Sequence, residues 1–230
     1  MIISHKHKFI YIKTAKTAGT SVVVFLADQC ANGDLVTAIS KNDSIEAQKA
    51  GYHFPSGLSS SIEQAKLWLW KKQNESSHHG KIFKNLPAAD AYRFLGSDVW
   101  NSYYKFCFER NPYDRAISLY YWHNRFAETM PGLNEYILTA KDKKLSNWLT
   151  YTIDDQVVMD HVYQFENLKE EIKNIAAKLS FTKTSLPQLK ISQNRDKTHY
   201  SKLLSSQARV RIEAACFREI EYFQYRWEDK

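Results

Sequence analysis

The chain lacks the sequence features of several protein classes. It has only three cysteines, Cys30, Cys107 and Cys216, which are widely separated and form no Cys-x-x-Cys pair. We therefore expect buried free thiols in a reducing compartment and no metal site. The longest apolar run, Val22–Ala27, is too short to cross a bilayer, and the first residues lack the apolar core of a secretory signal. These absences predict a cytoplasmic protein without a membrane span.

Length and charge narrow the choice of ligand. A chain of 230 residues without internal repeats fits a single α/β domain over residues 1–230. The formal net charge of +7 suits an anionic partner, such as a doubly phosphorylated nucleotide, a nucleic acid or an acidic glycan. We expect no nucleic-acid partner, because the basic residues are scattered and no RNA- or DNA-binding motif is present.

The segment Lys8–Ser21, KFIYIKTAKTAGTS, is the most informative part of the chain. A short apolar strand leads into a turn with one glycine and several hydroxyls, and a helix over Val22–Gln29 follows at once. Unpaired N–H groups and the helix dipole attract an oxyanion to such a terminus, and Lys16 adds a mobile ammonium. The turn resembles a P-loop, although the G-x-x-x-x-G-K-[ST] spacing is absent. The alternative is an ordinary turn in which the glycine has no role beyond its backbone freedom.

A second motif follows another predicted strand, Tyr103–Glu109. The strand leads into the sequence RNPYDR, and a helix over Ala116–Arg125 then carries Ser118. The Asn-Pro pair suits a helix cap followed by the first helical turn. Arg110 is therefore expected at the C-terminal end of a strand, where open α/β sheets bind ligands.

The remaining pattern alternates strands with helices, which favours a parallel sheet covered on both faces. Several shorter helical pieces are expected between the main elements. The main expected elements are helices over Ile62–Gln73, Ala88–Leu95 (ended by Gly96), Leu168–Leu179 and Gln207–Tyr225, and a strand over His161–Phe165.

Taken together, the motifs resemble the nucleotide signatures of sulfotransferases that use 3′-phosphoadenosine 5′-phosphosulfate (PAPS). The similar branch contains carbohydrate sulfotransferases and small bacterial relatives. The matching segments are K-T-A-G-T-S, F-x-R-N-P-Y-D-R-x-x-S-x-Y-Y, the FENL of residues 165–168 and Glu219–Trp227, so the resemblance spans residues 8–227. It implies a three-layer, P-loop-NTPase-like α/β fold with a mainly parallel central sheet flanked by helices. It also implies transfer of a sulfuryl group, without a metal, from PAPS to a hydroxyl or amine of a small molecule or glycan, which leaves PAP.

The resemblance also assigns roles to individual residues. Lys16 matches the lysine that contacts the leaving-group oxygens, and Arg110 and Ser118 match the pair that grips the 3′-phosphate through charge-assisted hydrogen bonds. Arg195 and Lys197 lie where the family has a loop over the nucleotide, with a solvated charge run as the alternative. The loop residues that match the 5′-phosphosulfate site are Thr17, Ala18, Gly19, Thr20 and Ser21. Arg115, which lies in the second motif beside Asp114, is expected to brace the loop through Asp114 or a backbone carbonyl.

The sequence departs from the family pattern at the position of the general base. Relatives often carry a Lys-His pair before the second motif, but the aligned residues here are Lys84-Asn85, and an amide accepts no proton at neutral pH. His79, with its neighbour His78, is one candidate, unless the two are simply exposed to solvent. Glu109 is the second candidate, with a structural ion pair as its alternative. The third possibility is an amine acceptor that needs no strong base, or an active site that has drifted.

Two other functions stay open at this point. A catalytically silent nucleotide- or polyanion-binding module is favoured by Asn85 and opposed by Lys16, because binding alone needs no lysine at the scissile bond. A nucleotide-dependent phosphoryl transferase is opposed by the missing Gly-Lys-Ser/Thr and by the lack of an acidic strand end suited to Mg²⁺.

Overall fold

The computed structural model describes residues 1–31, 33–36, 41–52, 86–187, 189, 196 and 198–230. Some of the features expected from the sequence lie outside these residues. They are the helix over Ile62–Gln73, the base candidate His79, the aligned Asn85, and the loop residues Arg195 and Lys197.

The main sheet of the described residues has five strands in the order β3-β1-β2-β4-β7. Strand β1 (Ile2–Ser4) pairs antiparallel with β2 (Phe9–Tyr11) and with β3 (Leu35–Val36). Strands β2, β4 (Tyr104–Glu109) and β7 (His161–Gln164) are mutually parallel. The prediction of a mainly parallel sheet is therefore wrong: the sheet is mixed. The error arose because β1 is too short to show a sequence period, and the tight turn after it returns the chain as a hairpin, which is necessarily antiparallel.

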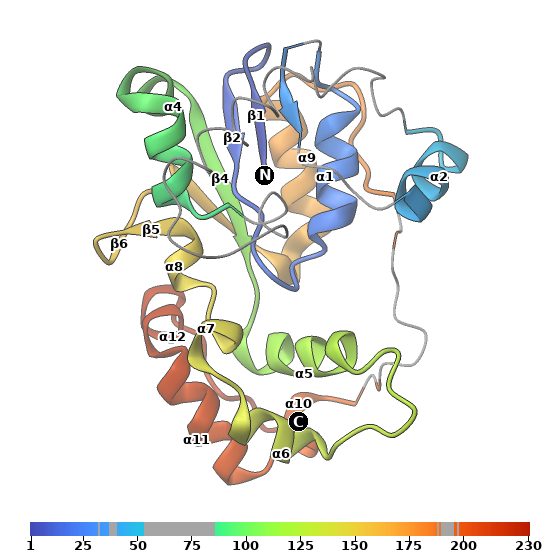
Figure 1. Ribbon diagram of the computed structural model, residues 1–230, viewed down its shortest axis with the longest axis vertical. Coiled ribbons are helices and arrows are strands. Elements are labelled where there is room, and N and C mark those ends of the chain that lie inside the picture. The colour runs from blue at the N-terminus through green and yellow to red at the C-terminus, as the bar shows by residue number, and fades with distance from the viewer. Residues whose placement is uncertain (32, 37–40, 53–85, 188, 190–195, 197) are drawn as a thin grey trace.

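Helices cover both faces of this sheet (Figure 1). Helices α1 (Gly19–Ala27) and α9 (Leu168–Lys178) pack on one face, against Phe106 and Phe108 of β4. Helix α4 (Ala88–Ser102) packs on the other face, where Cys107 points. The alternation along β4 follows from the two-residue period of a strand. The chain is thus an α/β protein with a mixed central sheet between helical layers.

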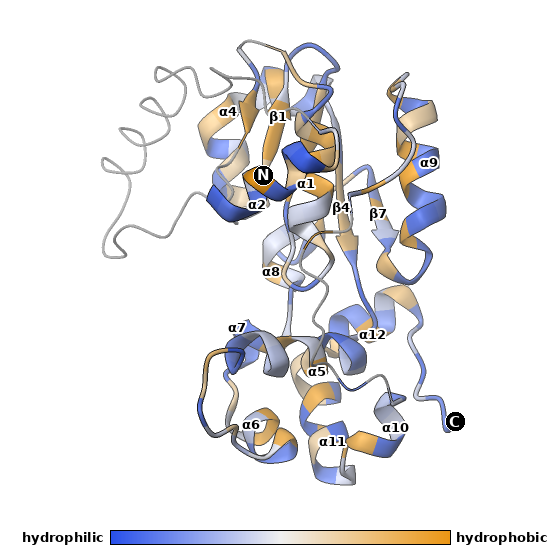
Figure 2. Cartoon of the chain, turned by 90° about the vertical axis from the view of Figure 1, so that its right-hand side faces the viewer, coloured by the Kyte–Doolittle hydropathy of each residue, from blue (hydrophilic) through white to orange (hydrophobic). Residues whose placement is uncertain are grey.

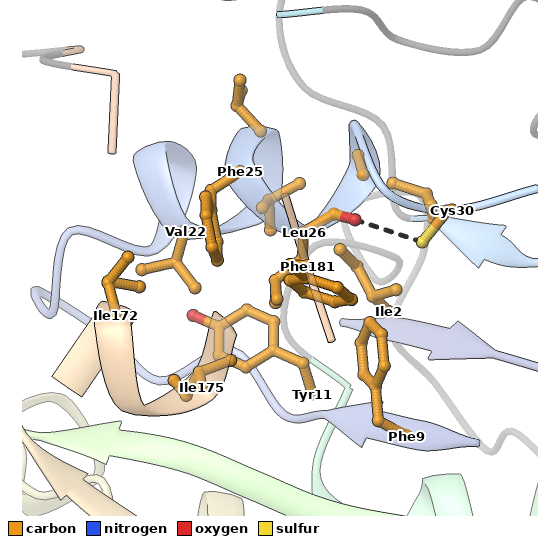
Figure 3. Packing of buried hydrophobic residues seen from close by; sticks show 14 of the residues in the cluster. Ile2, Phe9, Tyr11, Val22, Phe25, Leu26, Cys30, Ile172, Ile175 and Phe181 are labelled. Carbon is orange, nitrogen blue, oxygen red and sulfur yellow. Dashed lines mark hydrogen bonds between the residues drawn. The ribbon is translucent and has the colours of Figure 1, made fainter. Parts of the chain in front are cut away.

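Figure 3 shows the hydrophobic core on the face covered by α1 and α9, where Val22, Phe25 and Leu26 of α1 pack against Tyr11 and Phe181. Helix α1 is apolar on nearly every side and almost wholly buried. Its run of β-branched valines has poor intrinsic helix propensity, so burial rather than propensity stabilises it. Helix α9 instead keeps a hydrophilic outer face (Figure 2).

Further helices gather beyond the end of β4, below the sheet in Figures 1 and 2. They share a separate apolar core that includes Tyr113, Ile137 and Ile212. These helices are α5 (Pro112–His123), α6 (Leu133–Thr139), α7 (Asp142–Leu145), α10 (Tyr200–Leu203), α11 (Ser206–Ala215) and α12 (Phe217–Phe223). The remaining elements are α2 (Lys41–Lys49), α8 (Trp148–Tyr151), the 3-10 helix η2 (Phe165–Asn167) and the ribbon of β5 (Thr152–Ile153) with β6 (Gln156–Val157).

Some element boundaries differ from those predicted. Helix α5 begins at Pro112 and ends at His123, two residues before the predicted end at Arg125. The predicted cap is confirmed: Asn111 accepts hydrogen bonds from two backbone N–H groups, and Pro112 lies in the first turn. Helix α4 does not end at Gly96 but continues after a kink there. The long C-terminal helix is two helices, because Cys216 leaves the helical conformation at φ −119° and ψ 21°.

Candidate active site

The loop between β2 and α1 forms one wall of the candidate site. Lys16 and Ala18 both have left-handed backbones, with φ of 65° and 54°. A Cβ at Gly19 would lie 2.7 Å from Cε of Lys13, so any larger residue at this position would force the Lys13 side chain to move. The first bond of α1 runs from Val22 N to the Ala18 carbonyl at 3.1 Å. The N–H groups of residues 18–21 therefore have no partner within this described helix, and such groups attract an anion.

Two of the predicted hydroxyl ligands point into the protein. Thr17 is fully buried, and its hydroxyl lies 2.8 Å from the hydroxyl of Thr14, which donates to the Phe108 carbonyl at 2.5 Å. Ser21 is also buried, with its hydroxyl 3.4 Å from the backbone nitrogen of Leu189. The first contact fastens the loop to β4 in the sheet, and the second fastens the start of α1 to Leu189. The loop thus presents backbone N–H groups rather than these two hydroxyls at its outer surface.

Arg110 joins the two sequence motifs. Its Nη1 donates to the backbone carbonyl of Lys16 at 2.9 Å, and its Nε donates to Asp114 at 2.7 Å. Its guanidinium also stacks on the ring of Phe165, 4.2 Å from the ring centroid. Glu166 accepts from the backbone N–H of Asn111 at 2.6 Å. The FENL segment therefore packs directly against the second motif.

The side chain of Lys16 faces α5. Its Nζ lies 5.3 Å from the ring centroid of Trp122, and Arg125 stacks on the same ring at 4.1 Å. His123, which follows Trp122 in the sequence, forms a hydrogen bond between its Nδ1 and the hydroxyl of Tyr136. Burial, together with the positive charges of Lys144, Lys16 and Arg125, lowers the pKa of His123. Trp122 and His123 are both exposed, so a bound molecule has access to them.

Glu109 lies in a buried cluster of charges. Its carboxylate has no exposed surface, and its Oε1 lies 3.6 Å from Nε of Arg115. Arg115 also lies 3.6 Å from Glu219 of α12. Burial raises the pKa of Glu109, while Arg115 opposes that rise. The expected partner of Arg115 was wrong: it contacts Glu109 and Glu219, whereas Asp114 pairs with Arg110.

Asn147, which no sequence motif indicates, holds the inner side of the loop that carries Lys16. Its side-chain amide pairs with both the N–H and the carbonyl of Ala15, at 3.0 and 3.2 Å. The same amide donates to Glu109 at 3.2 Å. No local signal indicates this role, because Asn147 and Ala15 are 132 residues apart in the sequence.

The family comparison agrees with this geometry. A sequence model of the sulfotransferase family matches residues 1–226 of the 230. The chain belongs to the sulfotransferase family. Sulfuryl transfer is accordingly the general chemistry of its family. The resemblance drawn from the two motifs is thus confirmed.

Relatives outside the family model add little to the description of this sulfotransferase. A protein of Archaeoglobus fulgidus, itself described only as uncharacterized, is 26% identical over 104 residues, covering 41% of this chain and 82% of that protein. No solved structure matches the chain significantly.

The structure brings some of the predicted site residues together and leaves others apart. Lys16 and Arg110 meet, whereas Ser118 lies half-buried further along α5. The loop residues from Thr17 to Ser21 surround the start of α1. Among the described residues, no cluster of three metal-ligating side chains occurs. Within the same part of the chain, no helix is both long and apolar enough to cross a membrane.

Proposed function

We propose that this sulfotransferase takes its sulfuryl group from PAPS and transfers it to a hydroxyl or amine of a small molecule or glycan. The observation that supports this most is the 2.9 Å hydrogen bond from Arg110 to the carbonyl of Lys16. It puts the two motifs, which are 94 residues apart, at one sheet edge. A nucleotide with a phosphosulfate at one end and a 3′-phosphate at the other matches two adjacent anion sites of this kind.

In this proposal the loop at the start of α1 holds the 5′-phosphosulfate in the manner of a P-loop. Backbone N–H groups of Ala18, Gly19 and Thr20 supply the donors, and the inward hydroxyls of Thr17 and Ser21 keep the loop in shape. In this proposal the 3′-phosphate replaces Asp114 as the anionic partner of the nearly buried Arg110, assisted by Ser118 on α5. The sequence resemblance adds Arg195 and Lys197, which lie outside the described residues, to the proposed nucleotide ligands.

Transfer breaks the bond between sulfur and the bridging phosphate oxygen and forms a bond from sulfur to the acceptor oxygen. Negative charge then develops on the departing phosphate, and the ammonium of Lys16 neutralises it. A lysine suits this role because its compact charge sits on a flexible stem and can follow the oxygen. The other product is PAP.

We assign the acceptor proton to His123 rather than to Glu109. The Glu109 carboxylate has no exposed surface and lies against Arg115, so an acceptor has no route to it. The ring of His123 is exposed and follows Trp122, whose ring contacts Lys16. When Nδ1–H donates to the Tyr136 hydroxyl, Nε2 keeps a lone pair for the proton. The lowered pKa keeps this ring neutral at pH 7.

Calorimetry with PAP and with ATP–Mg²⁺ tests the donor. We expect PAP to bind without a divalent metal and ATP to bind much more weakly. Arg110→Ala should weaken PAP binding by roughly 1.5–3 kcal/mol, the usual cost of losing a charged hydrogen-bond partner. Arg209→Ala is the matched control, since Arg209 pairs with Glu213 four residues along the same helix. Tighter binding of ATP–Mg²⁺ would instead indicate a phosphoryl transferase, and PAP binding without turnover of PAPS would indicate a silent module.

The pH dependence of kcat tests the base. Neutral His123 accepts the proton, so kcat should fall as the pH drops through its pKa, which lies below the ordinary 6.5. His123→Gln should remove this fall in kcat at low pH, the acid limb of the pH–rate profile, and should lower kcat by about 10²–10⁴-fold. His79→Gln, Glu109→Gln and, as a surface control, His161→Gln should keep the limb. Loss of the limb in His79→Gln alone would assign the base to His79, and retention in all variants would favour an amine acceptor.

A further inference from the structure

Asn147 holds the residue directly before Lys16. Its Oδ1 accepts from Ala15 N at 3.0 Å, and its Nδ2 donates to the Ala15 carbonyl at 3.2 Å. The side chain is almost completely buried, with 3% of the residue exposed. Only an amide offers an acceptor and a donor on one flat group, so asparagine fits this double contact in a way that aspartate does not.

The same amide belongs to a ring of hydrogen bonds around Lys16. Its Nδ2 also lies 3.2 Å from Oε1 of Glu109, and that oxygen accepts from Arg110 N at 2.9 Å. Arg110 in turn donates to the Lys16 carbonyl at 2.9 Å. Lys16 is therefore held on its N-terminal side through Ala15 and on its C-terminal side through its own carbonyl.

Lys16 needs such support because its backbone has φ of 65°. L residues with a side chain rarely adopt this left-handed conformation, which persists only where surrounding contacts over-determine it. The conformation sets the direction in which the lysine side chain leaves the loop. Contacts that hold the peptide on either side of it therefore set the point and direction from which the flexible lysine side chain extends.

Asn147 is itself anchored by the buried acid of α12. Oε1 of Glu219 accepts from Asn147 N at 2.9 Å, from Trp148 N at 3.2 Å and from the Ser146 hydroxyl at 2.6 Å. Arg115 lies 3.6 Å from the same oxygen. The C-terminal helix thus fixes the position of Asn147, and through Asn147 that of the loop.

We infer that Asn147 is a positioning residue that aims Lys16 at the departing phosphate. This inference rests on the proposed function, in which Lys16 neutralises that phosphate. It assigns Glu109 and Glu219 to the support of Asn147. The sequence motifs alone do not reveal this arrangement, because Asn147 lies in neither of them.

The test is a double-mutant cycle between Asn147→Ala and Lys16→Ala, measured as single-turnover rates with PAPS and as PAP affinity by calorimetry. A misaimed lysine should cost about tenfold or more in rate for Asn147→Ala, with a smaller loss of PAP affinity. In the Lys16→Ala background the same change should cost less than about twofold, because the group that Asn147 positions is already gone.

Asn134→Ala is the matched control. The Asn134 amide also joins two backbone groups, the Leu203 carbonyl at 3.2 Å and Ser205 N at 2.9 Å, but it links α6 to the turn between α10 and α11. It should leave the rate unchanged. If Asn147→Ala fails to fold, Asn147→Ser supplies the same cycle, since its shorter side chain keeps a polar group at the site but cannot make both contacts with Ala15.

Two results would overturn the inference. One is an equal loss of rate in both backgrounds, which marks Asn147 as merely structural, and the other is an equal loss for Asn134→Ala. Failure of the proposed function is recognised separately, because the unsubstituted protein would then neither bind PAP nor turn over PAPS.

Discussion

Lys16 combines an unusual backbone with a charged side chain beside an aromatic ring. Its left-handed φ, the hydrogen bond to its carbonyl from Arg110 and the contact of its ammonium with Trp122 all concern one residue. Each of these features restricts where the charge can lie. A residue that only bound an anion would need no such restriction, since an ammonium on a flexible stem finds an anion from many directions.

Lys16→Ala should therefore lower kcat far more than it weakens PAP binding. In the proposed mechanism the charge that Lys16 neutralises appears mainly in the transition state, so the loss of Lys16 falls on the rate. Alanine keeps the same backbone requirement, and the fold should be retained. Rates with PAPS and calorimetry with PAP measure the two effects. A variant with near-normal kcat would show that Lys16 only binds.

At the scale of single elements, glycine marks the places where a helix must bend or a loop must pass closely. Gly96 lies inside α4 with φ of 76° and ψ of 166°, a conformation open essentially to glycine alone. The helix resumes directly after it. The sequence predicted the break correctly but not the resumption, because a glycine ends a helix as often as it kinks one.

Gly96→Ala should lower the free energy of unfolding by about 1–3 kcal/mol, the cost of forcing a side chain into that backbone region. Nothing lies within 4 Å of the added Cβ, so a clash does not contribute. Gly132→Ala is the control, since Gly132 has an ordinary φ of −58°. Urea denaturation of both variants measures the difference. Equal stability of the two would mean that the kink relaxes without cost.

At the scale of the whole molecule, buried charges tie distant segments together. Glu219 and Arg115 connect the C-terminal helices to the strand that ends at Glu109. At the opposite end of the sheet, Asp34 accepts from the Ser4 hydroxyl at 2.8 Å, from His5 N at 2.7 Å and from Ala31 N at 2.9 Å. Charged groups are expensive to bury. The Asp34 carboxylate is held by these hydrogen bonds, whereas Glu109 Oε2, Arg115 Nη1 and Glu219 Oε2 have no hydrogen-bond partner among the described residues.

The stability of the fold should depend on Asp34 in a defined pH range. Burial alone would raise the pKa of Asp34, but its hydrogen bonds outweigh burial and lower the pKa below the ordinary 3.8. The native state thus releases the proton more readily than the unfolded chain. The stabilisation is therefore present above about pH 4 and is lost as the pH falls through the lowered value.

Asp34→Asn should accordingly cost about 1.5–3 kcal/mol at pH 7, and the difference from the unsubstituted protein should shrink below pH 4. Urea denaturation across pH 2.5–7 measures this, with Asp98→Asn on the exposed part of α4 as control. A difference that stays constant with pH would show that the lost contacts do not depend on the charge of Asp34.

Local sequence was enough to predict the two motifs and the strands and helices that carry them. The strand–turn–helix around Lys16 and the strand end, cap and helix after Arg110 each lie within about a dozen residues, where period, cap and turn chemistry act directly. Their similarity to one family then gave the general chemistry. The order of the two motifs along two parallel strands also put Lys16 and Arg110 at one sheet edge, as the structure has them.

Tertiary structure alone decided the rest. The mixed sheet depends on the direction in which the three residues of β1 pair between β3 and β2, and a run so short carries no such information. Glu109 reads equally well in the sequence as a base or as an ion-pair partner, and only its burial against Arg115 distinguishes the two roles. Asn147 reaches Ala15 across 132 residues. Such pairings depend on which surfaces meet when the core packs, and that is a property of the whole fold rather than of any segment.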